Sequence, residues 1–154
     1  MRWGRLAGLA SAAVIACTLL VAPGLASATG TEGCTPGYWK NHTDSWAASG
    51  YSPTQTVESV FNVPASLAPL GDATLLEALS FKGGPGKLGG ARILLRAAVA
   101  GLLNISNPTI DYGGVKANFI SRTNTWLASG SRERMLNLAR EFDTRNNQGT
   151  CPLN

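Results

Sequence analysis

The feature that most constrains the fold of this 154-residue chain is a pair of distant cysteines, Cys34 and Cys151. A bond between them would close a loop around nearly the whole polar part of the chain, so its first and last segments would have to meet. A third cysteine, Cys17, lies in an apolar N-terminal segment. The fate of that segment therefore decides how many cysteines the folded domain contains.

The first 28 residues have the pattern of a signal peptide. Two arginines precede an apolar stretch over residues 6–25, and Ala26-Ser27-Ala28 then supplies the small residues that signal peptidase accepts. We expect cleavage after Ala28, which removes Cys17. The product is a single secreted, extracellular domain, residues 29–154.

Two alternatives for the N-terminal segment stay open. A stretch of roughly 20 apolar residues can also remain as a membrane anchor, although Pro23-Gly24 near its end favours cleavage. Residues 14–17 loosely match a lipid-attachment motif that ends in Cys17. A lipidated cysteine should close the apolar stretch, whereas residues 18–22 continue it.

Cleavage leaves two cysteines in an exported chain, and an even number of cysteines in that setting indicates a disulfide. Only one intramolecular pairing, Cys34–Cys151, is then available. Two free thiols are the alternative.

Charge excludes two classes of partner. The net charge of +4 includes Arg2 and Arg5 of the signal peptide, and the remaining basic residues are scattered singly. We therefore expect neither nucleic-acid binding nor attachment to a membrane surface. We also expect no membrane span after residue 28, because Arg96 interrupts the longest apolar run.

Hydrophobic periodicity predicts an all-α fold, a small bundle of about five helices preceded by an ordered aromatic loop over residues 33–52. Ser52-Pro53 starts the first helix, Asp72 caps the second and Ser131 caps the last. The glycine-rich residues 82–90 should break regular structure. The expected helices cover residues 52–61, 72–79, 91–103, 115–127 and 131–145.

The candidate ligand-binding residues gather in the aromatic loop. Flat aromatic faces beside amide and ammonium donors suit polysaccharide or another cell-envelope or matrix component. The alternative is that the aromatic rings pack over the bundle while Asn41 and His42 hydrogen-bond to loop backbone. The candidates are Tyr38, Trp39, Lys40, Asn41, His42 and Trp46.

Catalytic and metal chemistry have little support. One histidine and two paired cysteines are too few ligands for zinc, so we expect no metal and no cofactor. The glycine-rich residues 82–90 lack the spacing of a phosphate-binding loop. A hydrolase that uses His42 or a carboxylate pair, Glu58 with Glu77 or Glu77 with Asp111, is the alternative to a non-catalytic function.

The hexapeptide Gly37-Tyr38-Trp39-Lys40-Asn41-His42 resembles the signature of a family of extracellular domains in secreted and surface proteins, largely of bacteria and mostly uncharacterised. The resemblance continues through residues 71–74, 89–100 and 146–153. It implies an extracellular location and assigns no catalytic residue.

Overall fold

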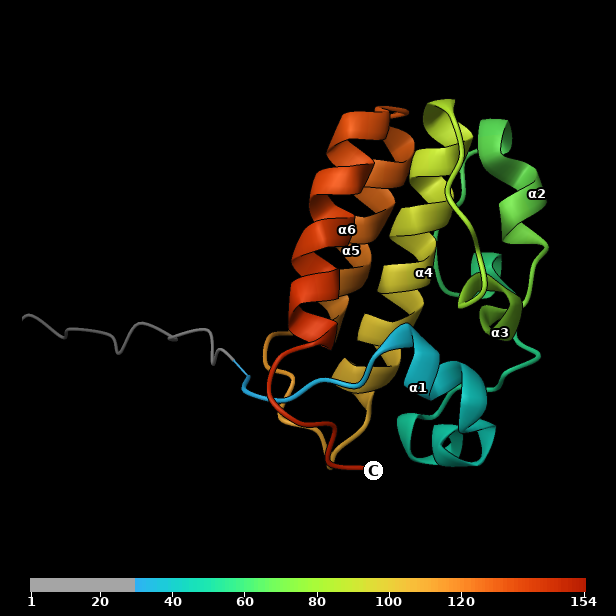
Figure 1. Cartoon of the computed structure of the whole chain (residues 1–154). Helices are drawn as coiled ribbons and strands as arrows, with labels where there is room; N and C mark the ends of the chain where they lie inside the picture. The colour runs from blue at the N-terminus through green and yellow to red at the C-terminus, as the bar shows by residue number, and fades with distance from the viewer. Residues whose placement is uncertain (1–29) are drawn as a thin grey trace, which may run out of the picture.

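One long helix, α4 (Gly86–Ser106), runs through the middle of the structure and contacts most other elements. The computed structural model describes residues 30–154, so the predicted signal peptide and Cys17 lie outside the described residues. Helices α5 (Lys116–Ala128) and α6 (Arg132–Asn146) pack on one side of α4, and shorter helices cover the other side (Figure 1).

The short elements precede α4 in the chain. Three are α-helical: α1 (Pro36–Asn41), α2 (Ala68–Gly71) and α3 (Leu75–Ala78). Three are 3₁₀-helices: η1 (Thr43–Ser49), η2 (Val57–Ser59) and η3 (Ala65–Leu67). With no strand among residues 30–154 and one isolated bridge, the all-α prediction is confirmed.

Helix α4 lies at the centre because it is apolar on nearly every side, and its leucines are almost all fully buried. By length and composition alone, α4 could cross a membrane, with 21 residues that include Arg96. Its most apolar window is 72% buried inside the domain, as the core helix of a folded protein would be.

The two C-terminal helices follow the predicted ranges within a few residues. Ser131 caps α6 as expected, because its side chain accepts a hydrogen bond from the Arg134 N–H. Met135, Leu138 and Phe142 recur at helical spacing and face the core.

The segment predicted to be a loop, residues 33–52, is mostly helical. Thr35 caps α1, its hydroxyl accepting from the Tyr38 N–H at 3.1 Å, and Pro36 occupies the first helical turn. Helix α1 is too short to show a hydrophobic period, so only its cap could have revealed it.

The helix predicted at residues 52–61 is also absent, apart from η2. The backbone of residues 55–57 instead forms hydrogen bonds with residues 73–75. The Val57 N–H donates to the Ala73 carbonyl, and the Leu75 N–H donates to the Gln55 carbonyl, each at 2.8 Å. These bonds use backbone N–H and carbonyl groups that a helix over residues 52–61 would need for its own hydrogen bonds.

Two further boundaries differ from the prediction. Thr74, rather than Asp72, caps α3, because Thr74 and Glu77 form a reciprocal capping box. Helix α4 begins at Gly86, inside the glycine-rich segment. There Gly89 passes so close to Gly84 that an added Cβ would lie 1.9 Å from the Gly84 carbonyl oxygen.

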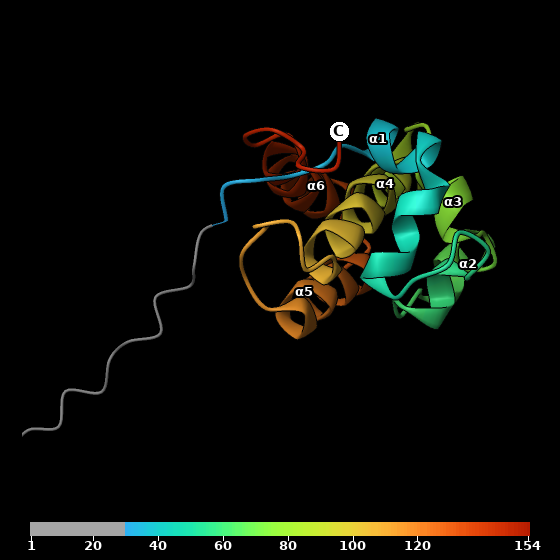
Figure 2. The same ribbon diagram turned by 90° about the horizontal axis from the view of Figure 1, so that it is seen from below.

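The two ends of the described chain meet at one end of the bundle. The predicted disulfide is present between Cys34 and Cys151, which are 117 residues apart. The N-terminal backbone is also tied to a distant loop, since the Thr31 and Glu32 N–H groups both donate to the Asp111 carbonyl. Figures 1 and 2 both show the C-terminus beside α1.

Candidate functional site

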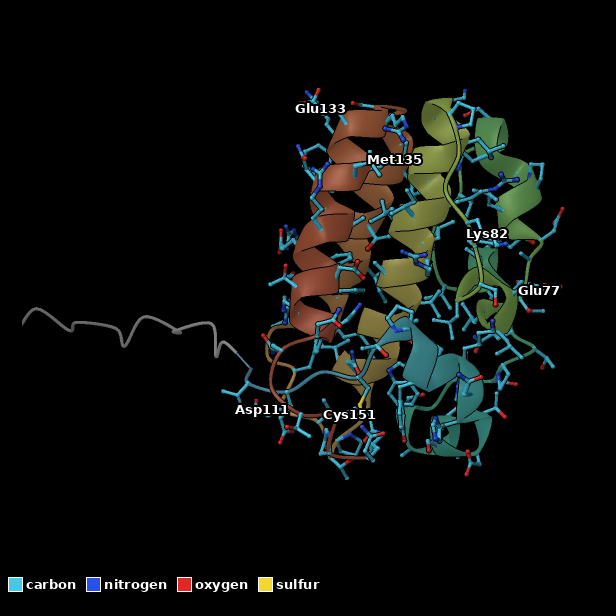
Figure 3. All side chains as sticks on the ribbon, viewed as in Figure 1. Glu77, Lys82, Asp111, Glu133, Met135 and Cys151 are labelled. Carbon is cyan, nitrogen blue, oxygen red and sulfur yellow. A yellow bond between two sulfur atoms is a disulfide. The ribbon has the colours of Figure 1, made fainter. Side chains whose placement is uncertain are left out.

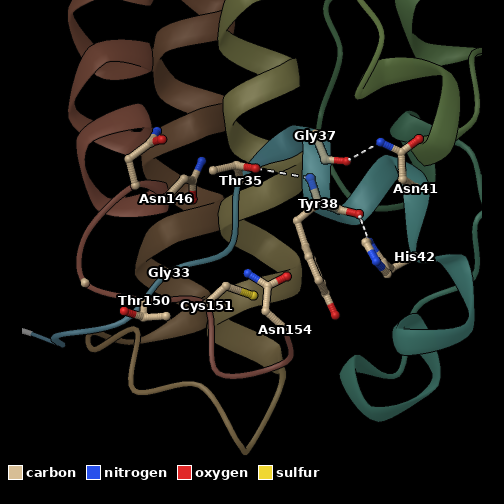
Figure 4. Close-up of a pocket in the computed structure, with 12 residues that line it drawn as sticks. Gly33, Thr35, Gly37, Tyr38, Asn41, His42, Asn146, Thr150, Cys151 and Asn154 are labelled. Carbon is tan, nitrogen blue, oxygen red and sulfur yellow. Dashed lines mark hydrogen bonds between the residues drawn. The ribbon is translucent and has the colours of Figure 1, made fainter.

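An open pocket of about 570 Å³ lies where α1 meets the residues that follow α6. We call residues 147–154 the C-terminal segment. The pocket is lined by Gly33, Thr35, Gly37, Tyr38, Asn41 and His42 on one wall and by Asn146, Asn147, Gly149, Thr150, Cys151 and Asn154 on the other (Figure 4). Of these described lining residues, none has a permanently charged side chain.

The His42 ring is held against Tyr38. The two rings stack with centroids 4.2 Å apart and planes 11° apart. The His42 Nδ1 atom lies 2.9 Å from the Tyr38 carbonyl oxygen, which can only accept, so Nδ1 must carry the proton. A neutral imidazole in this tautomer presents Nε2 as an acceptor, and no hydrogen bond within residues 30–154 uses Nε2.

Asn41 is exposed at the rim of the same wall. Its Nδ2 donates to the Gly37 carbonyl at 2.9 Å, which fixes the amide and leaves Oδ1 available to accept (Figure 4). Asn41 and His42 thus hydrogen-bond to nearby backbone, as the packing alternative expected, but both remain accessible from the pocket.

The tryptophans of the aromatic segment lie in the core. Trp39 is 0% exposed and Trp46 is 1% exposed. The Trp46 indole N–H donates to the Trp39 carbonyl, and the Trp39 indole N–H donates to Oδ1 of Asn104 on α4. The prediction that their faces bind a ligand is therefore wrong, because neither ring reaches the surface.

Asn104 is the centre of a buried polar network. Its side chain accepts from the Cys34 N–H and the Trp39 indole, and it donates to the Cys34 carbonyl and to Oδ1 of Asn146. Every hydrogen-bonding position of this amide is occupied, so burial of Asn104 leaves nothing unpaired.

Asn146 extends the network to the loop after α4. Its Oδ1 also accepts from the Tyr112 hydroxyl at 2.8 Å, and its Nδ2 donates to the Ala97 carbonyl. Burial raises the pKa of Tyr112 well above its usual range, opposed by the Arg145 guanidinium stacked over the ring. Tyr112 therefore stays protonated and serves as a donor.

Of the six candidate residues, the structure brings three to the pocket: Tyr38, Asn41 and His42. Lys40 is exposed but does not line it. Sequence reasoning missed the second wall, including Thr150 and Asn154. The predicted Cys34–Cys151 disulfide was the one sequence feature that could have indicated this wall, because it places residue 151 beside residue 34.

The carboxylate pairs do not assemble into an acid–base site in the pocket. Glu77 accepts from the backbone and hydroxyl of Thr74, and these bonds lower the pKa of Glu77. Asp111 accepts from Thr31, and Figure 3 shows Glu77 and Asp111 on opposite sides of the molecule. Glu58 does not line the pocket either. Within residues 30–154 no cluster of three or more potential metal ligands occurs.

Comparison with protein-family models, curated proteins and solved structures found no match.

Proposed function

We propose that this protein is an exported, non-catalytic domain whose pocket between α1 and the C-terminal segment binds an uncharged carbohydrate of a cell envelope or matrix. The observation that best supports this proposal is the set of side chains that line the pocket. Its side chains include asparagine amides and threonine hydroxyls, together with the exposed His42 ring held flat against Tyr38.

These groups match the chemistry of a sugar. Sugar hydroxyls both donate and accept hydrogen bonds, as amides and hydroxyls do. Asn41 Oδ1 and His42 Nε2 are oriented acceptors. Nδ2 of Asn41 donates to the Gly37 carbonyl and Nδ1 of His42 donates to the Tyr38 carbonyl, and these bonds fix the two side chains. A fixed side chain loses less conformational freedom when it binds. The absence of permanently charged side chains from the described lining favours neutral over acidic glycans.

The same lining disfavours the hydrolase alternative. A glycosidase of the usual kind needs two carboxyl groups on either side of the bond to be cleaved. No carboxyl side chain is among the described residues that line the pocket.

Export is supported by three features. Residues 1–28 have the signal-peptide pattern. The Cys34–Cys151 disulfide is of the kind that persists outside the cytosol. The 37–42 hexapeptide resembles the signature of extracellular domains. The partners proposed here are polysaccharides or envelope components, with no nucleic acid and no membrane span.

The binding proposal is tested by measuring affinity of the purified protein for cello-, chito-, manno- and maltotetraose, with a uronic-acid tetramer as the charged comparison. We expect at least one neutral tetramer to bind. Asn41→Ala and Asn154→Ala should each weaken binding about fivefold to tenfold, because each loses a hydrogen bond worth about 1 kcal/mol.

Asn118→Ala is the matched control, since Asn118 is an exposed asparagine on α5 away from the pocket. It should bind as the wild type does. Failure of all the neutral tetramers to bind, or unchanged affinity in both pocket variants, would contradict the proposal.

A further inference from the structure

The binding pocket consists of two walls that the disulfide joins directly. Residues 33–42 form one wall, and Cys34 belongs to this segment. Residues 146–154 form the other wall, which includes Cys151. The two walls are far apart in sequence. The geometry of the pocket therefore depends on what holds the C-terminal segment in place.

The end of that segment has few other attachments. Among the hydrogen bonds of the described chain, one joins residues 150–154 to the rest of the domain, from the Tyr38 hydroxyl to the Leu153 carbonyl at 3.1 Å. Leu153 is partly buried against the core. Before this stretch, Gln148 is anchored separately by its bonds to the Gly30 and Glu32 carbonyls.

The opposite wall is held independently of the sulfur atoms. The Cys34 backbone and the Trp39 indole bond to Asn104, and these contacts remain available when Cys34 is a thiol. Breaking the disulfide should therefore release residues 150–154 while α1 stays on the bundle.

We infer that the Cys34–Cys151 disulfide acts as a redox switch for the pocket: the oxidised protein binds carbohydrate, and the reduced protein folds but does not bind. This inference rests on the proposed function. It would confine binding to oxidising surroundings and keep the chain inactive while its cysteines are reduced, as they are in the cytosol.

The reductant is a dithiol. One of its thiolates attacks Sγ of Cys151, because Cys151 is only partly buried whereas Cys34 is 0% exposed. The S–S bond breaks, and Cys34 leaves as a thiolate that takes a proton. The second thiolate of the reagent then attacks the mixed disulfide and releases Cys151. Two electrons and two protons reach the protein, and the reagent becomes a disulfide.

The first test measures exposure of Tyr38, which is 8% exposed beneath the C-terminal segment. Tetranitromethane nitrates accessible tyrosines, and peptide mass spectrometry locates the product. In the Cys34→Ser/Cys151→Ser variant we expect nitration of Tyr38 to rise several-fold. Tyr51, a partly buried tyrosine outside the pocket, is the internal control and should react equally in both proteins.

The second test measures binding to the four neutral tetramers before and after reduction with dithiothreitol, at a temperature where circular dichroism shows full helicity. We expect affinity to fall at least about tenfold on reduction and to return on reoxidation. Reversal by reoxidation shows that reduction has not simply denatured the protein, so this arm needs no substituted variant.

The outcomes separate the two proposals. Equal binding by the oxidised and reduced folded protein overturns the redox switch and leaves the proposed function standing. Continued protection of Tyr38 from nitration in the folded Cys34→Ser/Cys151→Ser variant has the same consequence. Failure of the oxidised protein to bind any of the neutral tetramers overturns the proposed function and the switch with it.

Discussion

At the scale of single residues, the 37–42 hexapeptide contains both a core residue and residues that line the pocket. Trp39 enters the core and bonds to Asn104, whereas Asn41 and His42 stay at the surface of the pocket. The sequence allowed these residues to be singled out as a cluster. It could not show which of them are buried, because that depends on Asn104, which lies 65 residues away from Trp39 in the chain.

Asn104→Ala should be among the most destabilising substitutions in the domain. It leaves the buried Trp39 indole and Cys34 N–H without partners, and each unpaired buried group costs about 1–3 kcal/mol. We expect a loss of about 3–5 kcal/mol of unfolding free energy in denaturant titration, against less than about 0.5 kcal/mol for the exposed control Asn118→Ala. A loss below about 1 kcal/mol would contradict the role of the network.

His42→Ala tests a residue that lines the pocket and is not part of the core. The structure shows an exposed His42 ring stacked on Tyr38. The Tyr38 carbonyl also accepts a hydrogen bond from the His42 backbone N–H, which the substitution keeps. We expect a loss of less than about 1 kcal/mol, with weaker binding of the neutral tetramers. A large loss of stability would show that the ring is mainly structural.

At the scale of elements, helix length decided what could be predicted. The ranges of α5 and α6 follow from their hydrophobic period. Helix α1 depends on its cap at Thr35, and residues 55–57 pair with residues 73–75 instead of forming a helix. Contacts of that kind join distant segments, and a local period does not reveal them.

The contact between α5 and α6 includes an ion pair with a pH dependence. Two hydrogen bonds from the Arg122 guanidinium lower the pKa of the Glu141 carboxyl, opposed by partial burial. A carboxyl whose pKa is lower in the folded state stabilises the fold above its unfolded pKa, and this contribution disappears as the pH falls through the folded value.

Glu141→Gln should therefore reduce stability at neutral pH, and the difference should shrink in acid as the pH falls through the lowered folded-state pKa of the wild-type carboxyl. Both side chains are nearly half exposed, so the difference at neutral pH should stay below about 1 kcal/mol. Denaturant midpoints of both proteins across this pH range provide the measurement. A stability difference between the two proteins that grows toward acid pH would contradict the stabilising role of the ionised Glu141.

At the scale of the whole molecule, the disulfide sets the arrangement of the two ends. Its pairing could be predicted because two cysteines remain after the expected cleavage, and the structure confirms it. The pocket that it closes could not be predicted, because the second wall is a short polar segment with no pattern of its own.

Reduction should lower the melting temperature by on the order of 10 °C, because closing so long a loop contributes about 4–5 kcal/mol in the chain-entropy model. Thermal melts of oxidised and reduced protein by circular dichroism give the comparison. Coincident melts would show that the buried network alone maintains the fold.

Binding at the pocket is tested most directly by a ¹H–¹⁵N correlation spectrum of the oxidised protein, recorded while the tightest-binding of the four neutral tetramers is added. We expect the side-chain amide signals of Asn41 and Asn154 to shift. The indole signals of Trp39 and Trp46, both buried and hydrogen-bonded, should stay in place. Stationary asparagine signals beside moving tryptophan signals would contradict binding at the pocket, since the ligand would then contact residues that the structure places in the core.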